Sequence, residues 1–131
     1  MQEVYDFLKK CGAYYLATVD GEKPRIRPFG TVDIFEDKLY FQTGKIKNVS
    51  KQIALNPNVE LCAMSADGVW IRVGATAVED SRVEAKQHML DAHPLLKDRY
   101  SADDDNTQVF YLKNATATIY CFTTEPKEIK F

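Results

Sequence analysis

Positive charge is concentrated in one segment of a chain whose formal net charge is -2. Arg25 and Arg27 lie two residues apart, so a strand would place both side chains on the same face. Lys47 and Lys51 lie four residues apart, which makes them neighbours on one face of a helix. No aspartate or glutamate occurs in residues 38–59. Cations grouped in this way can bind a phosphate through charge-assisted hydrogen bonds.

The residues just before this predicted helix fit the hypothesis of an anion site. Thr43 and Gly44 lie where a predicted strand, LYFQT, gives way to the loop that precedes the helix. The start of a helix offers unpaired backbone N–H groups and a partial positive charge. The same cations also fit a plainer interpretation, in which they cover the solvated faces of a helix and a sheet. The residues alone leave both interpretations open.

The elements that would position these residues are mostly strands joined by tight turns. Apolar and polar residues alternate so as to predict roughly six or seven strands. Asp20-Gly21 is a strong hairpin signal, and Pro28 indicates an edge strand or a bulge because it cannot donate to a ladder. The expected strands cover residues 14–19, 25–35, 39–43, 59–65, 69–79, 109–113 and 115–122, with a last short one at 128–131.

Helices are expected at the start of the chain and after the third strand. The spacing of apolar residues over 4–11 predicts an amphipathic helix that Gly12 ends. Over residues 47–55 the spacing of apolar residues changes from the alternation of a strand to the period of a helix. Asn56-Pro57 stops this second helix. Its buried stripe is predicted to consist of Val49, Ile53 and Ala54.

A third helix is expected after the fifth strand. Ser81 and Glu84 have the spacing of a capping box, in which each side chain satisfies a free backbone donor at the helix start. The helix would run from about residue 82 to 92, and Pro94 would open a second short turn.

The composition is that of a single soluble domain spanning residues 1–131, with 45% hydrophobic and 27% charged residues. Hairpin-linked strands favour an antiparallel barrel in an α+β, mainly β, domain. The mild acidity argues against nucleic-acid or membrane-surface partners. Three dispersed cysteines and a charged N-terminus favour a cytoplasmic protein. Neither these cysteines nor the two histidines have the spacing of a metal site, so no metal is expected.

Three stretches of the sequence, taken in order, resemble the FMN-binding split-barrel proteins related to pyridoxamine 5'-phosphate oxidase. They are LATVDGEKPRIRPFG, LYFQTGKIKNVSKQIALNPNVELC and VWIRVGATAVED. The resemblance covers most of residues 13–80 and continues more weakly through VFYLKNATATIYCF. It implies a six-stranded antiparallel split barrel with peripheral helices, which forms a homodimer and holds two FMN molecules between its subunits.

The resemblance also implies which residues hold the cofactor phosphate. Arg27 matches the strand arginine that approaches it. Lys47 and Asn48 align with the first two positions of a phosphate-binding Ser-Arg-Lys run in the oxidase. The third position is Val49 here, which departs from that run. We infer that Lys51, one helical turn beyond Lys47, replaces the missing cation.

A second group of residues is implied to lie along the flavin ring. Pro28, Phe29 and Gly30 match a stretch whose backbone runs along the isoalloxazine. Thr43 and Gly44 match the strand-end turn that touches the cofactor.

Trp70, the only tryptophan, lies in VWIRVG, which matches a strand close to the dimer contact. It is expected either to face the neighbouring subunit's flavin or to be a core or interface aromatic without ligand contact.

The function implied by the resemblance is an FMN-dependent oxidoreductase that transfers a hydride to or from a small molecule. No catalytic side chain is identified. A true pyridoxamine 5'-phosphate oxidase is not expected, because those enzymes hold the substrate phosphate with an arginine-rich C-terminal segment and no arginine follows Arg99 here. The alternatives are a non-catalytic flavin or haem binding or sensing protein, a reductase that uses the deazaflavin coenzyme F420, and a purely structural dimer.

Overall fold

Eight antiparallel strands form one sheet in the computed structural model, which describes residues 1–131. Their order is β2-β1-β5-β6-β7-β4-β3, with β8 paired to β7. The end strands β2 and β3 do not pair with each other, so the sheet is open, and the expected α+β, mainly antiparallel fold is confirmed. The strands are β1 (Tyr14–Asp20), β2 (Lys23–Phe29), β3 (Asp33–Phe35), β4 (Lys38–Gly44), β5 (Asn58–Met64), β6 (Trp70–Glu79), β7 (Thr107–Tyr120) and β8 (Lys127–Lys130).

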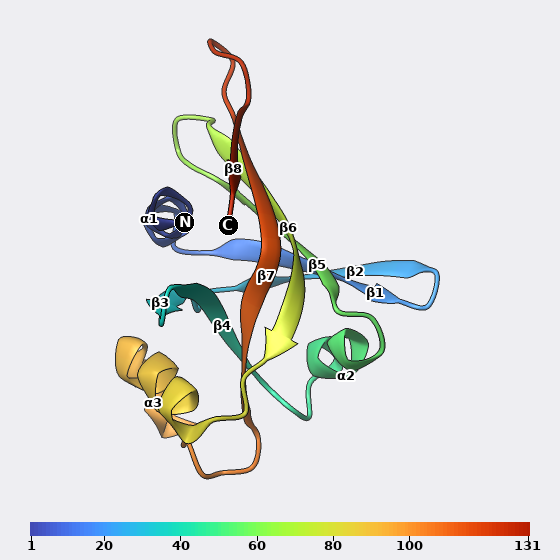
Figure 1. The fold of residues 1–131 in the computed structure, drawn as a ribbon, viewed down its shortest axis with the longest axis vertical. Helices are drawn as coiled ribbons and strands as arrows, with labels where there is room; N and C mark the ends of the chain where they lie inside the picture. The colour runs from blue at the N-terminus through green and yellow to red at the C-terminus, as the bar shows by residue number, and fades with distance from the viewer.

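The helices lie around the sheet as Figure 1 shows, with α2 (Asn48–Leu55) beside the hairpin of β1 and β2 and α3 (Val83–Ala92) near β4. The two chain termini lie close together in the same view. None of the helices has the length and apolar character needed to cross a membrane. They are α1 (Gln2–Cys11), α2 (Asn48–Leu55) and α3 (Val83–Ala92), with a short 3-10 helix, η1 (Pro94–Asp98).

The main core joins α1 and α2 to the inner face of the sheet, and it fixes the end of β2. Val4 and Leu8 of α1 are buried in it, as are Val49 and Ile53 of α2. Phe29, at the end of β2, packs edge-on against a core phenylalanine of β4 with ring centroids 5.7 Å apart. The predicted stripe of α2 is wrong at one position, since Ala54 is exposed and Ser50 is buried instead.

Residues 25–35, expected as one strand, form two strands at opposite ends of the sheet. β2 pairs with β1 through a two-residue turn at Gly21-Glu22, and β3 pairs with β4. The chain crosses between them at Thr31, whose carbonyl accepts a hydrogen bond from the Tyr14 hydroxyl at 2.7 Å. The edge position predicted from Pro28 is confirmed, because β2 ends the sheet.

Two further expectations are corrected by tertiary contacts. The two late strands are a single strand, β7, because a bulge at Asn114 (φ 52°) lets it bend without ending. The capping box of Ser81 and Glu84 is wrong, since α3 begins at Val83 with no side-chain cap.

Four charged and polar residues next to the start of α3 pair with one another, and we call Glu36, Tyr40, Asp80 and Arg82 the Arg82 network. The buried Asp80 carboxylate accepts hydrogen bonds from the Tyr40 hydroxyl (2.8 Å) and from Arg82 Nη2 (2.8 Å). Arg82 Nη2 also contacts Glu36 Oε2 at 2.7 Å. The Arg82 guanidinium holds the pKa of Asp80 well below its ordinary value. Burial and the contact with Asp80 raise the pKa of Tyr40. This network fixes the start of α3 against β4.

Candidate functional site

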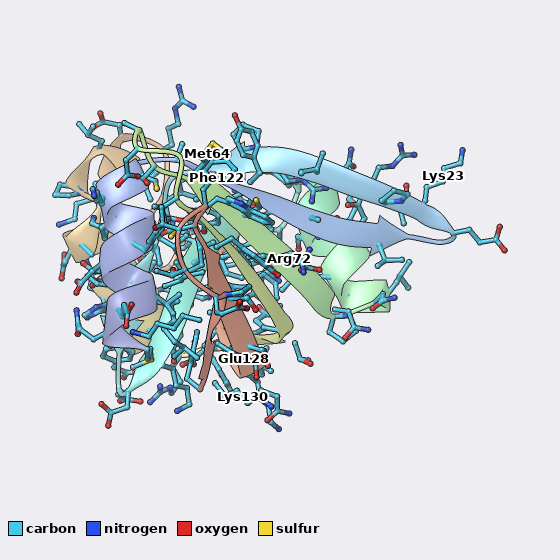
Figure 2. The ribbon with its side chains drawn as sticks, turned by 90° about the horizontal axis from the view of Figure 1, so that it is seen from above. Lys23, Met64, Arg72, Phe122, Glu128 and Lys130 are labelled. Carbon is cyan, nitrogen blue, oxygen red and sulfur yellow. The ribbon has the colours of Figure 1, made fainter.

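Two hollows lie on either side of the start of α2. The large hollow, with a volume of about 780 Å³, lies where the β1–β2 hairpin runs past α2 (Figure 2). The small pocket, of about 160 Å³, opens between the end of β2 and β4. Among the residues that line the large hollow are Arg25, Arg27, Asn48, Lys51 and Gln52. The small pocket is lined by Pro28, Phe29, Gly30, Thr31, Gln42, Thr43, Lys47, Leu96 and Tyr100.

The two arginines of β2 differ in how their charge is balanced. Arg25 is paired with Asp20, at 3.0 Å between Nε and Oδ2. Arg27 donates instead to neutral oxygens, Thr18 Oγ1 at 2.7 Å and Gln52 Oε1 at 2.6 Å. Burial lowers the pKa of Arg27, as expected for a partly desolvated cation without a counter-ion. Arg27 therefore brings an unbalanced positive charge to the large hollow, whereas Arg25 does not.

The start of α2 adds backbone donors and two more cations. Lys47 is the N-cap residue, and no side chain caps the helix. Lys47 and Lys51 have no carboxylate within ion-pair distance, whereas nearby Lys45 is paired with Asp105 at 3.2 Å. Asn48, the first helical residue, lines the large hollow with Lys51. The arrangement can hold an anion between β2 and the helix start.

Two of the residues that line the small pocket carry buried polar atoms with no partner within the chain. Gln42 is 4% exposed, and both its amide nitrogen and its amide oxygen lack a hydrogen bond. Thr43 is 3% exposed, and its hydroxyl also lacks one. Since buried polar groups are nearly always hydrogen-bonded, the pocket has unmet capacity for a polar ligand or water.

Sequence reasoning missed four lining residues of the small pocket, namely Thr31, Gln42, Leu96 and Tyr100. The one available signal was that Gln42 is the first polar residue after an apolar run in LYFQT. Leu96 and Tyr100 come from η1 and the loop after it, more than fifty positions along the chain, and only the tertiary fold brings them to β4.

Gly44, one of the predicted residues, lines neither hollow. A Cβ at this position would come within 3.2 Å of the Tyr100 ring and 3.1 Å of Asn106 Nδ2. The absence of a side chain at Gly44 therefore allows Tyr100 to pack against the strand that carries Thr43.

Trp70 is not brought to either hollow within one chain. It stacks on Tyr120, with ring centroids 4.1 Å apart. Its neighbour in the β5–β6 ladder is Met64, which Figure 2 shows on the sheet well away from the hairpin tip marked by Lys23. The other predicted residues, Gly44 excepted, line one of the two hollows.

Comparisons with known proteins agree with this fold. The family model described as pyridoxamine 5'-phosphate oxidase matches residues 1–121. No curated protein sequence matches the chain. The structure of a NimC/NimA family protein from Clostridium acetobutylicum is 40% identical, covers 100% of this chain and 92% of its own, and superposes with a TM-score of 0.97.

More distant structures share the fold alone. General Stress Protein 26 from Bacillus anthracis is 18% identical, with a TM-score of 0.78 over 99% of this chain and 97% of its own. A heme binding protein from Mycobacterium smegmatis is 16% identical, with a TM-score of 0.69 over 93% of this chain and 54% of its own.

Proposed function

This chain belongs to the pyridoxamine 5'-phosphate oxidase family, and we propose that it is an FMN-binding oxidoreductase acting on a small molecule. The observation that carries the proposal is the adjacency of the two hollows. Arg27 of β2 and Asn48 of α2 line the large hollow. Their neighbours along the chain, Pro28 and Lys47, line the small pocket. A ligand with an anionic end and a polar ring end fits such a pair.

The residues present suit FMN in charge and in hydrogen-bonding capacity. Arg27 and Lys51, with the uncapped start of α2, would hold the phosphate. Pro28, Phe29 and Gly30 would lie along the ring, with Thr43 as a polar contact. Pockets that enclose a drug-sized ligand measure about 300–1,000 Å³, so the small pocket of about 160 Å³ accepts only one edge of a tricyclic ring.

FMN, when bound, supplies hydride transfer. The chain's own residues bind the phosphate, orient the ring and shield one of its edges from water. No histidine, cysteine or glutamate lines either hollow, and the one carboxylate there, Asp20, is paired with Arg25, so we assign no proton-transfer role.

We also propose that the chain forms a homodimer through the outer face of β1, β5 and β6. Tyr15 and Met64 are 52% and 66% exposed there, and Trp70 stacks beside them. Aromatic and methionine side chains on one exposed face are typical of a protein interface. Light scattering should report twice the chain mass for the wild type and a monomer for the variant with Tyr15→Asp and Met64→Lys. A wild-type monomer would contradict the homodimer.

Haem binding is the second candidate to be tested, because one structural neighbour is a heme binding protein. Haem needs an axial ligand. His88 is paired with Asp33 at 2.6 Å, and His93 Nε2 accepts the backbone N–H of Val32 at 3.3 Å, so both histidines are already engaged. FMN is the better-supported ligand.

An absorption spectrum of the purified protein tests the proposal directly. We expect flavin bands near about 370 and 450 nm, either as isolated or after FMN is added and the excess removed. Anaerobic bleaching by NADH or NADPH would then identify the reductant. A protein that retains no FMN, or that shows a haem Soret band instead, would contradict the proposed function.

A further inference from the structure

We propose that the side-chain amide of Gln42 recognises the imide edge of the flavin, the N3–H group and its flanking carbonyls. The inference rests on the proposed function and goes further, because it says which edge of the ring enters the small pocket and which residue selects it.

The position of Gln42 is fixed by its backbone. Its N–H donates to Thr31 Oγ1 at 2.9 Å, the Thr31 hydroxyl donates back to the Gln42 carbonyl at 3.3 Å, and Gln42 is in register with Val109 of β7. The strand is therefore held on both sides. A loosely placed strand therefore does not explain why the side-chain amide of Gln42 is unpaired.

Two other glutamines near the site show that unpaired amides are not general here. Gln108 Oε1 accepts the Ser50 hydroxyl at 2.5 Å. Gln52 Oε1 accepts hydrogen bonds from Arg27 and Thr18. Only Gln42 has both amide atoms buried and without a partner. An unsatisfied buried amide is costly, so a partner from outside the chain is expected to meet it.

The chemistry of an amide selects the kind of edge that fits. Its oxygen accepts and its nitrogen donates, side by side, so it pairs with an edge that offers one donor next to one acceptor. Glutamine pairs with an adenine edge in DNA for the same reason. The flavin imide offers N3–H beside a carbonyl, whereas the dimethylbenzene edge offers neither.

The size of the small pocket agrees with this assignment. Leu96 and Tyr100 line the pocket together with Gln42, and its volume of about 160 Å³ admits an edge and not a whole ring. The same recognition would accept a deazaflavin, which carries the same imide, and would reject haem, which has none. Gln42 therefore selects a class of ring, while the cations of the large hollow select the phosphate.

The test compares FMN with 3-methyl-FMN, in which N3 carries a methyl group and the phosphate is unchanged. Binding to wild type, Gln42→Leu and Gln108→Leu is followed by quenching of flavin fluorescence. We expect methylation to weaken wild-type binding about tenfold, the loss for one or two net hydrogen bonds. Gln42→Leu should bind FMN about tenfold less tightly and lose the discrimination. Gln108→Leu, a buried glutamine that lines neither hollow, should keep it.

A second readout needs no ligand. Replacing an unsatisfied buried amide by a hydrocarbon side chain removes its desolvation cost, so ligand-free Gln42→Leu should have a higher Tm than wild type. Gln108→Leu should have a lower Tm, because it leaves the Ser50 hydroxyl unpaired.

The outcomes separate the two proposals. If the wild type binds neither flavin, the proposed function fails and this inference fails with it. If it binds FMN and 3-methyl-FMN equally well, only the role of Gln42 is overturned. If Gln42→Leu does not fold, Gln42→Met and the wild-type comparison of the two flavins decide the matter.

Discussion

The Arg82 network and the cations around α2 are two charged regions of one small protein, and they differ in how completely their charges are balanced. In the network, Asp80 meets both Tyr40 and Arg82 at 2.8 Å, and Glu36 completes the pairing. Around α2, Arg27 contacts only neutral oxygens, and Lys47 lacks a carboxylate partner.

The difference in charge balance separates residues that stabilise the fold from residues that are available to bind a ligand. A charge that is balanced inside the chain stabilises the folded state and has little left to offer a ligand. A charge that is left unbalanced beside a hollow costs the unliganded protein some stability and gains most when an anion arrives. Removing a group from each region should therefore change different observables.

The largest effect is expected for Asp80→Ala. This change leaves the buried Tyr40 hydroxyl without an acceptor and one side of Arg82 unpaired. Removing one member of a buried polar network should lower the free energy of unfolding by about 2–4 kcal/mol. Urea unfolding measures the change, with the exposed Asp105→Ala as the control. A comparable loss of FMN affinity in folded Asp80→Ala would break the separation between the two regions.

Acid should weaken the same network. The pKa of Asp80 is lowered in the folded protein, so its stabilisation is fully present above its ordinary pKa of about 3.9 and is lost progressively as the pH falls from there through the lower pKa of the folded state. Burial acts to raise the pKa of Asp104, but backbone N–H groups in its own loop lower it to about 2, so part of the acid sensitivity arises there. Wild-type stability should fall below about pH 5, and Asp80→Ala should show a shallower fall. Identical slopes would mean that Asp80 is not the titrating group.

Substituting the arginines of β2 tests the other region within one strand. Arg27→Ala should weaken FMN binding by about 1–3 kcal/mol, the range for hydrogen bonds to charged groups. Arg25→Ala should change it by less than about twofold, because Asp20 already balances Arg25. Fluorescence titration gives both dissociation constants. Arg27→Lys, which keeps the charge, should recover part of the loss. Equal effects of the two alanine variants would contradict a phosphate site built on Arg27.

The smallest effect concerns two lysines that are two residues apart. Lys47→Ala should weaken FMN binding by about 1–2 kcal/mol, since Lys47 is exposed and partly screened by solvent. Lys45→Ala should leave it nearly unchanged, because Lys45 is paired with Asp105. Raising the salt concentration should shrink the Lys47 effect. An Lys45 effect as large as that of Lys47 would show that general positive charge, and not unbalanced charge, attracts the ligand.

The sequence was sufficient where a residue's neighbours along the chain determine its place. The spacing in α1, the Gly21 turn and the edge position of Pro28 are local or nearly local, and all three were predicted correctly. The capping box at Ser81 failed because a carboxylate one residue earlier, Asp80, is recruited by contacts from β4.

The charged residues of the candidate site could be predicted from the sequence. Its buried polar atoms without hydrogen-bond partners could not. Arg27 and Lys51 are recognisable as cations in any sequence, but Asp20 as the partner of Arg25 depends on the hairpin. Gln42 could not be identified, because a glutamine ending a strand is usually exposed. Tyr100, which lines the same pocket, reaches β4 only through α3 and η1.

The prolines of β2 have a consequence for self-association of the sheet. Pro24, Ile26 and Pro28 occupy alternate positions opposite β1. Alternate residues of an edge strand direct their N–H groups outward, and prolines are confined to those outward positions. Of these three positions only Ile26 can donate to an incoming strand. The free edge of β2 therefore cannot template a continuous ladder, which protects this edge of the open sheet from fibril growth by strand addition.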